Sequence, residues 1–406
     1  MQETTVARPA SRPAWLIDSA DFWRLWFVGL VVFSVRWVET VAVGVFVYQR
    51  TDSAFDVAMM TMLRMLPMGL FGAFLGAIAE RIERRIALII VVGSMVVTSA
   101  VLAVLAQLDL LAVWHLAVAS FLNGIAWATD NPVRRVMIGE AVGAARMSHA
   151  MSIDVGANNA SRMIGPTVGG LLLAGVGIHG VFALSVLLYV VAVLAACRVR
   201  YRNSMAVSTT ESVIARIAAG VRLVRNDRRL IGTLTVTVIY NVFGWPFTSM
   251  VPVIGQDRLG LGAEGIGILS SMDGLGAFAG AVLMAMFCRP QLYRGAYVGG
   301  VLLYMVMLIV FALVPLPEVA GLALLCTGLG GAGFSIMQAT LVYLAAPPEM
   351  RSRTLGVLSV CIGVGPVGFI ALGWLADAIG APAATAATGM AGLLMMLLTR
   401  RLWLAI

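Results

Sequence analysis

Several ionisable side chains lie inside long apolar stretches of this sequence, where a charge is costly to bury and usually serves a function. Arg36 and Glu39 are three residues apart, a spacing that puts both on one helix face. At about 1.5 Å per residue, Arg64 lies at a similar depth in the next apolar stretch and can reach Glu39. These three residues are predicted to bind a charged solute or a proton. A permanent structural ion pair is the alternative.

Further polar residues occupy other apolar stretches. Asp154, Asn158 and Arg162 follow one another at intervals of four residues, so they share about one helical face. Asp273 has no ionised neighbour nearby in the sequence, and its carboxyl is, with that of Glu39, the expected carrier of a coupling proton. A protonated structural acid is the alternative. The other amide side chains in this set of candidates are Asn123 and Asn241.

Aromatic residues form a second set of candidates. Trp127, Trp245 and Phe247 can line an apolar pocket, although aromatic residues in such stretches more often pack or anchor an interface. The three histidines and four cysteines share no metal-like spacing. A phosphate-binding loop that ends in Lys is impossible because the sequence contains no Lys. We therefore expect no metal site, no ATP-driven pumping and no catalytic constellation.

The elements that must position these residues are long apolar helices. Hydrophobic residues make up 60% of the 406 residues and charged residues only 12%, whereas soluble domains contain about 25% charged residues. A helix that crosses a membrane needs about 20 mainly apolar residues. Twelve such helices are predicted, at 22–48, 57–79, 86–107, 111–132, 148–174, 178–197, 230–255, 264–288, 295–314, 319–345, 354–376 and 382–404.

An internal repeat relates the first six helices to the last six. The run Gly72–Ala77 is echoed at Gly276–Ala281, and the pair at 165–166, Gly then Pro, is echoed at 365–366. Each helix thus matches the one six places later, as in a parallel repeat. The sequence predicts an all-α membrane protein of twelve transmembrane helices in two pseudo-symmetric six-helix halves.

The predicted halves comprise residues 1–197 and 230–406. The linker, 198–229, carries apolar residues at helical spacing among arginines and is predicted to include an amphipathic helix on the cytoplasmic face. All 28 basic residues are Arg, and the segments on one side hold only Arg50 and Arg258. Because basic residues concentrate in cytoplasmic loops, both termini are predicted to be cytoplasmic, in a bacterial cytoplasmic membrane. This topology explains the formal charge of +8 without a nucleic-acid partner.

The segment after the second predicted helix carries a charged motif formed by Gly76, Glu80, Arg81, Arg84 and Arg85. It resembles the loop G-x-L-a-D-R-x-G-R-[RK] of the major facilitator superfamily, with Glu in place of the usual Asp and of the second Gly. The resemblance implies an ion-pair latch at the cytoplasmic face that holds the outward-facing state. Simple anchoring of the loop by its basic residues is the alternative.

A second motif spans Ser161–Gly170 in the fifth predicted helix and contains Gly165 and Pro166. It resembles the g-x-x-x-G-P-x-x-G-G antiporter motif, in which small residues permit close helix contact and Pro can bend the helix. Asp130–Arg135 and Pro348–Arg353 resemble segments of the twelve-span drug:proton antiporter branch that includes macrolide-efflux and enterobactin-exporter proteins. The fourth helix departs from this pattern because it lacks a mid-span Arg.

These features predict a secondary active transporter that exports a small organic molecule, drug-like or siderophore-like, by proton antiport with alternating access. The alternatives are proton-coupled or facilitative uptake of an organic solute, and a transporter-like sensor or scaffold. The expected partners are a small-molecule substrate, protons and membrane lipids, for a monomer without cofactors, enzymatic activity or nucleic acid. The three arginines and three acids named within the helices balance in charge. This balance permits an anionic or zwitterionic ligand and does not exclude a hydrophobic drug.

Overall fold

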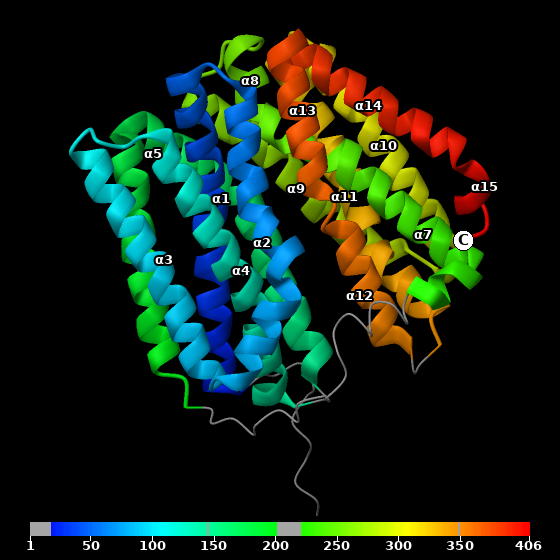
Figure 1. The fold of residues 1–406 in the computed structure, drawn as a ribbon, viewed down its shortest axis with the longest axis horizontal. Coiled ribbons are helices and arrows are strands. Elements are labelled where there is room, and N and C mark those ends of the chain that lie inside the picture. The colour runs from blue at the N-terminus through cyan, green and yellow to red at the C-terminus, as the bar shows by residue number, and fades with distance from the viewer. Residues whose placement is uncertain (1–17, 144–145, 201–220, 348–349) are drawn as a thin grey trace, which may run out of the picture.

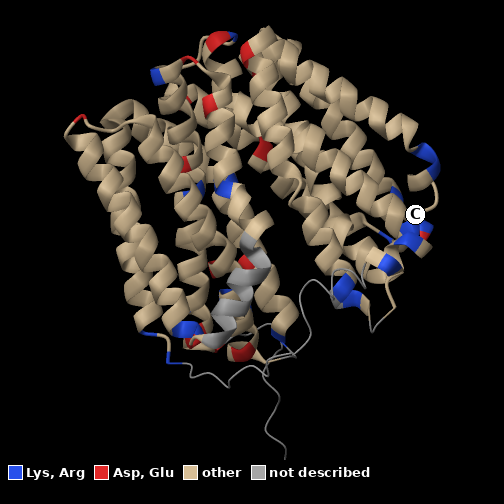
Figure 2. Cartoon of the chain, in the orientation of Figure 1, with Lys and Arg blue, Asp and Glu red and all other residues tan. Residues whose placement is uncertain are grey.

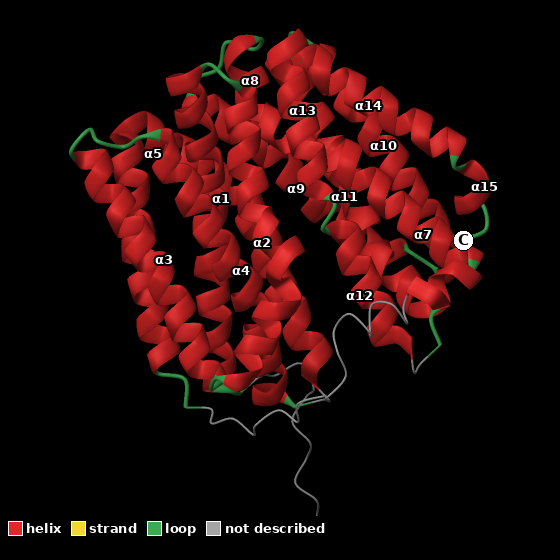
Figure 3. Ribbon diagram, viewed as in Figure 1, coloured by secondary structure: helices red, strands yellow, loops and turns green. Residues whose placement is uncertain are grey.

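A computed structural model describes residues 18–143, 146–200, 221–347 and 350–406 of this chain; the side chains of 71–81 and of Ser352 lie outside the description. Of the predicted helix of the linker, only residues 221–226 are described, and they are helical; the rest of it and the segment 348–349 lie outside the description. Every regular element in the described part of the chain is a helix (Figure 3). The predicted all-α class is therefore confirmed.

The N-terminal half is built from five long helices that span the height of the molecule (Figure 1). Their bounds are α1 Ala20–Thr51, α2 Ala54–Arg81, α3 Arg84–Gln107, α4 Val113–Val142 and α5 Met147–Cys197. The last contains 51 residues and covers the two helices predicted at 148–174 and 178–197. Its backbone is non-helical at Gly177, with φ 77°, so a kink separates the two stretches near the predicted boundary.

The turn between α1 and α2 shows how local sequence sets helix ends. Asp52 adopts the left-handed conformation with φ 52°, which stops α1. The Ser53 hydroxyl then accepts a hydrogen bond from the backbone N–H of Asp56 at 3.1 Å and caps the first turn of α2. The two helices therefore form a hairpin of fixed register.

The C-terminal half contains helices that are interrupted near their middles. Their bounds are α7 Arg228–Ile239, a π-helical segment Tyr240–Gly244, a 3₁₀ turn Trp245–Ser249, α8 Met250–Asp257, α9 Ala263–Phe287, α10 Tyr293–Leu313, α11 Pro317–Ala345, α12 Arg351–Ile362, α13 Gly365–Ile379, α14 Ala381–Leu398 and α15 Arg400–Trp403. The single helix predicted at 230–255 is thus four consecutive segments. Pro246 lies at the start of its 3₁₀ turn, where the missing N–H ends regular α-helical bonding.

Nine helices in the described residues are long and apolar enough to cross a membrane by length and composition, with α5 counted once. Large apolar side chains on their surfaces are exposed, among them Trp374 at 67% and Leu398 at 65%. A belt of this kind suits contact with lipid. The fold is that of a multi-pass membrane protein, and the count of twelve spans stays a prediction.

The two halves approach each other at the end of the molecule where α1 stops and α2 begins, and their helices diverge toward the opposite end (Figure 1). We call the first end the outer end, after its predicted orientation. There the Tyr48 hydroxyl of α1 bonds Asp257 of α8. Asp377 of α13 accepts hydrogen bonds from the Ser53 hydroxyl at 2.9 Å and from the Phe55 N–H at 3.1 Å.

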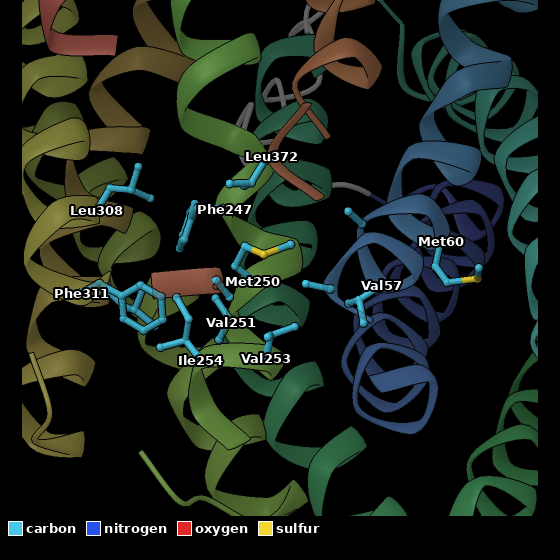
Figure 4. Close-up of a cluster of buried hydrophobic side chains, with 14 of the residues drawn as sticks. Val57, Met60, Phe247, Met250, Val251, Val253, Ile254, Leu308, Phe311 and Leu372 are labelled. Atoms are coloured by element: carbon cyan, nitrogen blue, oxygen red, sulfur yellow. The ribbon is translucent and has the colours of Figure 1, made fainter. Parts of the chain in front are cut away.

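An apolar cluster lies behind these polar contacts (Figure 4). Val57 and Met60 of α2 belong to it, together with Phe247, Met250 and other buried side chains of the C-terminal half. In a bilayer such a cluster stabilises mainly by close packing, because lipid chains are as apolar as the side chains. The outer ends of the halves therefore form a packed interface.

Candidate functional site

A cavity of about 280 Å³ lies between the halves. Its walls come from α1, α2, α4 and α5 on one side, and from the π-helical segment, the 3₁₀ turn, α11 and the end of α12 on the other. Its charged and amide lining residues are Arg36, Arg64, Asn158, Arg162, Asn241 and Gln338. The structure thus brings five of the nine predicted solute- or proton-binding residues to one space.

Arg64 is fixed where α2 crosses α1 and α4. Gly124 of α4 leaves no room for a Cβ against the Arg64 carbonyl, so the two helices touch there. The guanidinium donates to the Thr40 hydroxyl at 2.7 Å and to the Arg36 carbonyl at 3.3 Å. Its distance to the Glu39 carboxylate is 3.9 Å, so the predicted approach of Arg64 to Glu39 is found.

Glu39 faces the interior of the N-terminal half. It is only 2% exposed, and its carboxylate accepts from the Ser99 hydroxyl at 3.3 Å and the Asn123 amide at 3.5 Å. A small cavity of about 20 Å³ adjoins it, and Tyr189 also lines this space. Glu39 and Asn123 therefore form an inner chamber beside the central cavity.

Arg36 is not paired with Glu39, although the two share one helix. Its guanidinium instead stacks on the Trp127 ring of α4, 3.8 Å from the ring centroid. Within the described part of the chain this guanidinium makes no ion pair or hydrogen bond. The predicted Arg36–Glu39–Arg64 group is thus one pair, Arg64 with Glu39, and a separate arginine in the cavity wall.

Arg162 and Asp273 form an ion pair between the halves, from α5 to α9. Asp273 is 7% exposed, and one of its carboxylate oxygens has no hydrogen-bond partner. Asp273, which has no ionised neighbour nearby in the sequence, therefore has one in the structure. Its partner comes from a helix 111 residues away, a distance that inspection of neighbouring residues does not cover.

The Gly-Pro motif of α5 packs against two helices at once. Gly165 and Gly169 leave no space for a side chain against α1, and Gly170 leaves none against the backbone of α9. The Thr167 hydroxyl and the Ser271 hydroxyl share a hydrogen bond of 2.7 Å, and the Thr167 N–H donates to Ser271 at 3.1 Å. Small residues thus let α5 join the halves beside Arg162.

Asp154 lies apart from the cavity, although Asn158 and Arg162 of the same helix line it. Its carboxylate pairs with Arg134 and, at 3.4 Å, with Arg135. Arg134 is fully buried and also pairs with Asp130 at 3.4 Å. This cluster replaces the predicted role of Asp154 in the cavity. The i,i+4 spacing of Asp130 and Arg134 was the available sequence signal.

Only part of the predicted latch lies in the described side chains. Arg84 pairs with Glu140 of α4 at 2.5 Å, and Arg85 donates to the Cys197 carbonyl at the end of α5 at 2.6 Å. The surroundings of Gly76 and the side chains of Glu80 and Arg81 fall outside the description. Arg84 and Arg85 therefore hold α3 within the N-terminal half, and a latch between the halves stays a prediction.

Of the three aromatic residues predicted to line a pocket, the structure places two at the cavity and one elsewhere. Trp127 and Trp245 line the cavity, whereas Phe247 is buried in the apolar cluster. Sequence reasoning missed Trp37, Tyr240 and Gln338 as lining residues. The π-helical turn gives Tyr240 its position, and no simple sequence pattern marks such a turn. Among the described residues no group of three or more His, Cys, Asp or Glu side chains could hold a metal ion.

Comparisons with known proteins agree with this architecture. A family model described as transmembrane secretion effector matches residues 15–405. Macrolide efflux protein A of Streptococcus pyogenes is 22% identical over 366 residues, covering 88% of this chain and 90% of that protein. The multidrug efflux pump Tap of Mycolicibacterium fortuitum is 27% identical over 369 residues, covering 87% and 88%. The staphyloferrin A transporter of Staphylococcus aureus is 21% identical and covers 68% and 67%.

Solved structures show the same fold. A bacterial homologue of the lysosomal transporter Spinster, in an inward-facing and unoccupied conformation, superimposes with a TM-score of 0.74 at 14% identity, covering 97% of each chain. The nucleoside transporter NupG gives a TM-score of 0.74 at 12% identity, covering 95% of this chain and 99% of that one. The chain is a non-enzymatic transporter and belongs to the transmembrane secretion effector family of the major facilitator superfamily.

Proposed function

We propose that this chain exports a small organic molecule in exchange for protons, by alternating access of the central cavity. The observation that carries the proposal is the Arg162–Asp273 pair, which crosses between the halves beside the cavity. Separation of the outer ends would pull these two charges apart in a medium of low dielectric constant. Such a step is costly unless the carboxyl takes up a proton.

Protonation of Asp273 offers a way to couple proton entry to the opening of the outer end. A proton that arrives from outside neutralises the carboxyl, and Arg162 is then free to separate from α9. The inner chamber around Glu39 offers a second site, linked to the cavity through Arg64. The efflux proteins among the relatives support export as the direction.

Transport into inside-out vesicles tests the proposal. Respiration acidifies the lumen, and uptake of labelled erythromycin, staphyloferrin A and 2-naphthoate is measured with and without the chain. We expect chain-dependent accumulation of at least one compound, lost when nigericin collapses the pH gradient. Accumulation that persists without the gradient would refute proton antiport, and accumulation only in right-side-out vesicles would favour uptake.

Substitution of Asp273 tests its assigned role. Asp273→Asn should abolish gradient-driven accumulation and preserve substrate counterflow, because the neutral amide resembles a permanently protonated carboxyl. Glu264→Gln, at an exposed acid in the first turn of the same helix, is the matched control and should retain both activities. Gradient-driven accumulation by the Asp273→Asn variant would contradict the role.

A further inference from the structure

The charges that face the central cavity do not balance. Three guanidiniums, of Arg36, Arg64 and Arg162, line it. Glu39 pairs with Arg64 and Asp273 with Arg162, and the third acid predicted for the spans, Asp154, is occupied by Arg134 and Arg135 elsewhere. Arg36 borders the Glu39 chamber but makes no ion pair, so it is left as a cation without an ion-pair partner in the described residues.

The hydrogen-bonding groups of the cavity wall also favour an anion, because most of those without a partner are donors. Among described lining residues, the buried polar atoms without a partner include the indole N–H groups of Trp37 and Trp127 and the Nε–H of Arg162. All three are donors. The one unpartnered acceptor is the Gln338 amide oxygen, and an amide can turn its NH₂ group to the same point.

Trp127 also holds the free guanidinium in place. The Arg36 guanidinium lies 3.8 Å from the centroid of the Trp127 ring, and stacking on an indole keeps the planar group oriented. Trp37, Tyr240, Trp245 and Phe334 supply aromatic surface around it. The cavity therefore presents an oriented cation and several donors within an apolar, aromatic wall.

From these observations we propose that the transported molecule is an amphipathic organic anion, whose carboxylate or similar oxyanion binds Arg36 and whose aromatic or apolar body packs on the tryptophans. This inference names the substrate class of the exporter and rests on the proposed function. It also changes the charge balance expected from the sequence. A partly buried cation without an ion-pair partner is costly, and an anionic substrate would neutralise it, whereas a cationic substrate would add to the cost.

Equilibrium dialysis of three probes that share one ring system tests the proposal. The probes are 2-naphthoate, uncharged 2-naphthamide and cationic 2-naphthylmethylammonium, measured against the chain in detergent micelles and against empty micelles. The wild-type chain should bind naphthoate about tenfold more tightly than naphthamide and the cation most weakly. Equal binding of naphthoate and naphthamide, binding of neither, or preference for the cation would overturn the proposal.

Variants of Arg36 separate recognition of the anion from a structural effect. Arg36→Gln should weaken naphthoate binding about tenfold and leave naphthamide binding within about twofold, and Arg36→Lys should restore part of the loss. Arg50→Gln is the matched control, because Arg50 lies on the same helix over Phe46 but is exposed at its end, and it should bind like wild type. An equal loss of both probes in Arg36→Gln would contradict the proposal.

This binding experiment does not depend on proton coupling. If transport in vesicles is independent of the gradient but Arg36 still selects naphthoate, only the antiport proposal fails. If coupled transport holds while Arg36→Gln leaves naphthoate binding unchanged, only the anion proposal fails.

Discussion

Arg134 and Arg36 show how differently two arginines of one half can be surrounded. Arg134 is fully buried between Asp130 and Asp154, and Gly29 of α1 makes room for its guanidinium. Arg36 faces the cavity and has no carboxylate partner in the described residues. A buried arginine held between two carboxylates is expected of a structural element. An arginine that faces a cavity without a carboxylate partner is expected of a ligand site.

Substitution of Arg134 should therefore destabilise the protein strongly. Arg134→Met leaves two buried carboxylates, Asp130 and Asp154, without their main partner, and removal of one member of a buried ion pair costs about 3–5 kcal/mol. The melting temperature in detergent should fall by many degrees. Arg135→Met is the control, because its side chain is 42% exposed and an exposed pair contributes about 1 kcal/mol or less. Similar melting temperatures for the two variants would show that burial of Arg134 is not stabilising.

Sequence reasoning at this scale succeeded where a partner lies on an adjacent helix. The depth of Arg64 and Glu39 along a short hairpin was sufficient to predict their approach, which the structure confirms at 3.9 Å. It failed for Asp273, whose partner lies on a helix of the other half. The depth of a residue along its helix does not show which residue of the other half its side chain contacts.

At the scale of elements, α5 and α9 depend on glycine for their contact. A Cβ at Gly170 would collide with the backbone of α9, while Gly175 of the same helix has open space around it. Gly170→Ala should lower the melting temperature, because backbone atoms must move apart. Gly175→Ala should leave it unchanged or raise it, since Ala in a helix is favoured over Gly by about 1 kcal/mol. Equal effects would show that the close approach of α5 and α9 is not limiting for stability.

The broken seventh helix marks the limit of pattern-based prediction. Apolar residues over 230–255 predicted one membrane-spanning helix, and Arg228–Asp257 is long and apolar enough to span a membrane but is broken into four segments; Pro246 was visible in the sequence. The π-helical turn that precedes it widens the helix by a local change in hydrogen bonding. This change leaves hydropathy unaltered, yet it positions Tyr240 and Asn241 at the cavity.

At the scale of the whole molecule, the membrane dictates both the apolar helices and the side on which basic residues lie. It does not dictate how the two halves are placed relative to each other. Figure 2 shows basic residues mainly at the lower end of the N-terminal half and along the right-hand and lower edge of the C-terminal half, and few at the top, the outer end. This distribution suits the orientation predicted from the arginines. Which ends of the halves touch depends on a small difference in free energy between conformations. Composition and periodicity carry no information about that difference.

The polar contacts at the outer end should set this balance. Asp377 accepts from the Ser53 hydroxyl and from the Phe55 N–H at the start of α2, where the helix dipole favours a negative charge. Asp377→Asn removes that charge and one strong acceptor, so the halves should separate more often at this end. Spin labels at Arg50→Cys and Arg258→Cys, with the native cysteines replaced, would report a new population at longer distance by double electron–electron resonance. Asp109→Asn, in the α3–α4 turn of the N-terminal half alone, should leave the distances unchanged. A distribution for Asp377→Asn that matches wild type would show that the apolar cluster and the Tyr48–Asp257 hydrogen bond keep the outer end closed without this carboxylate.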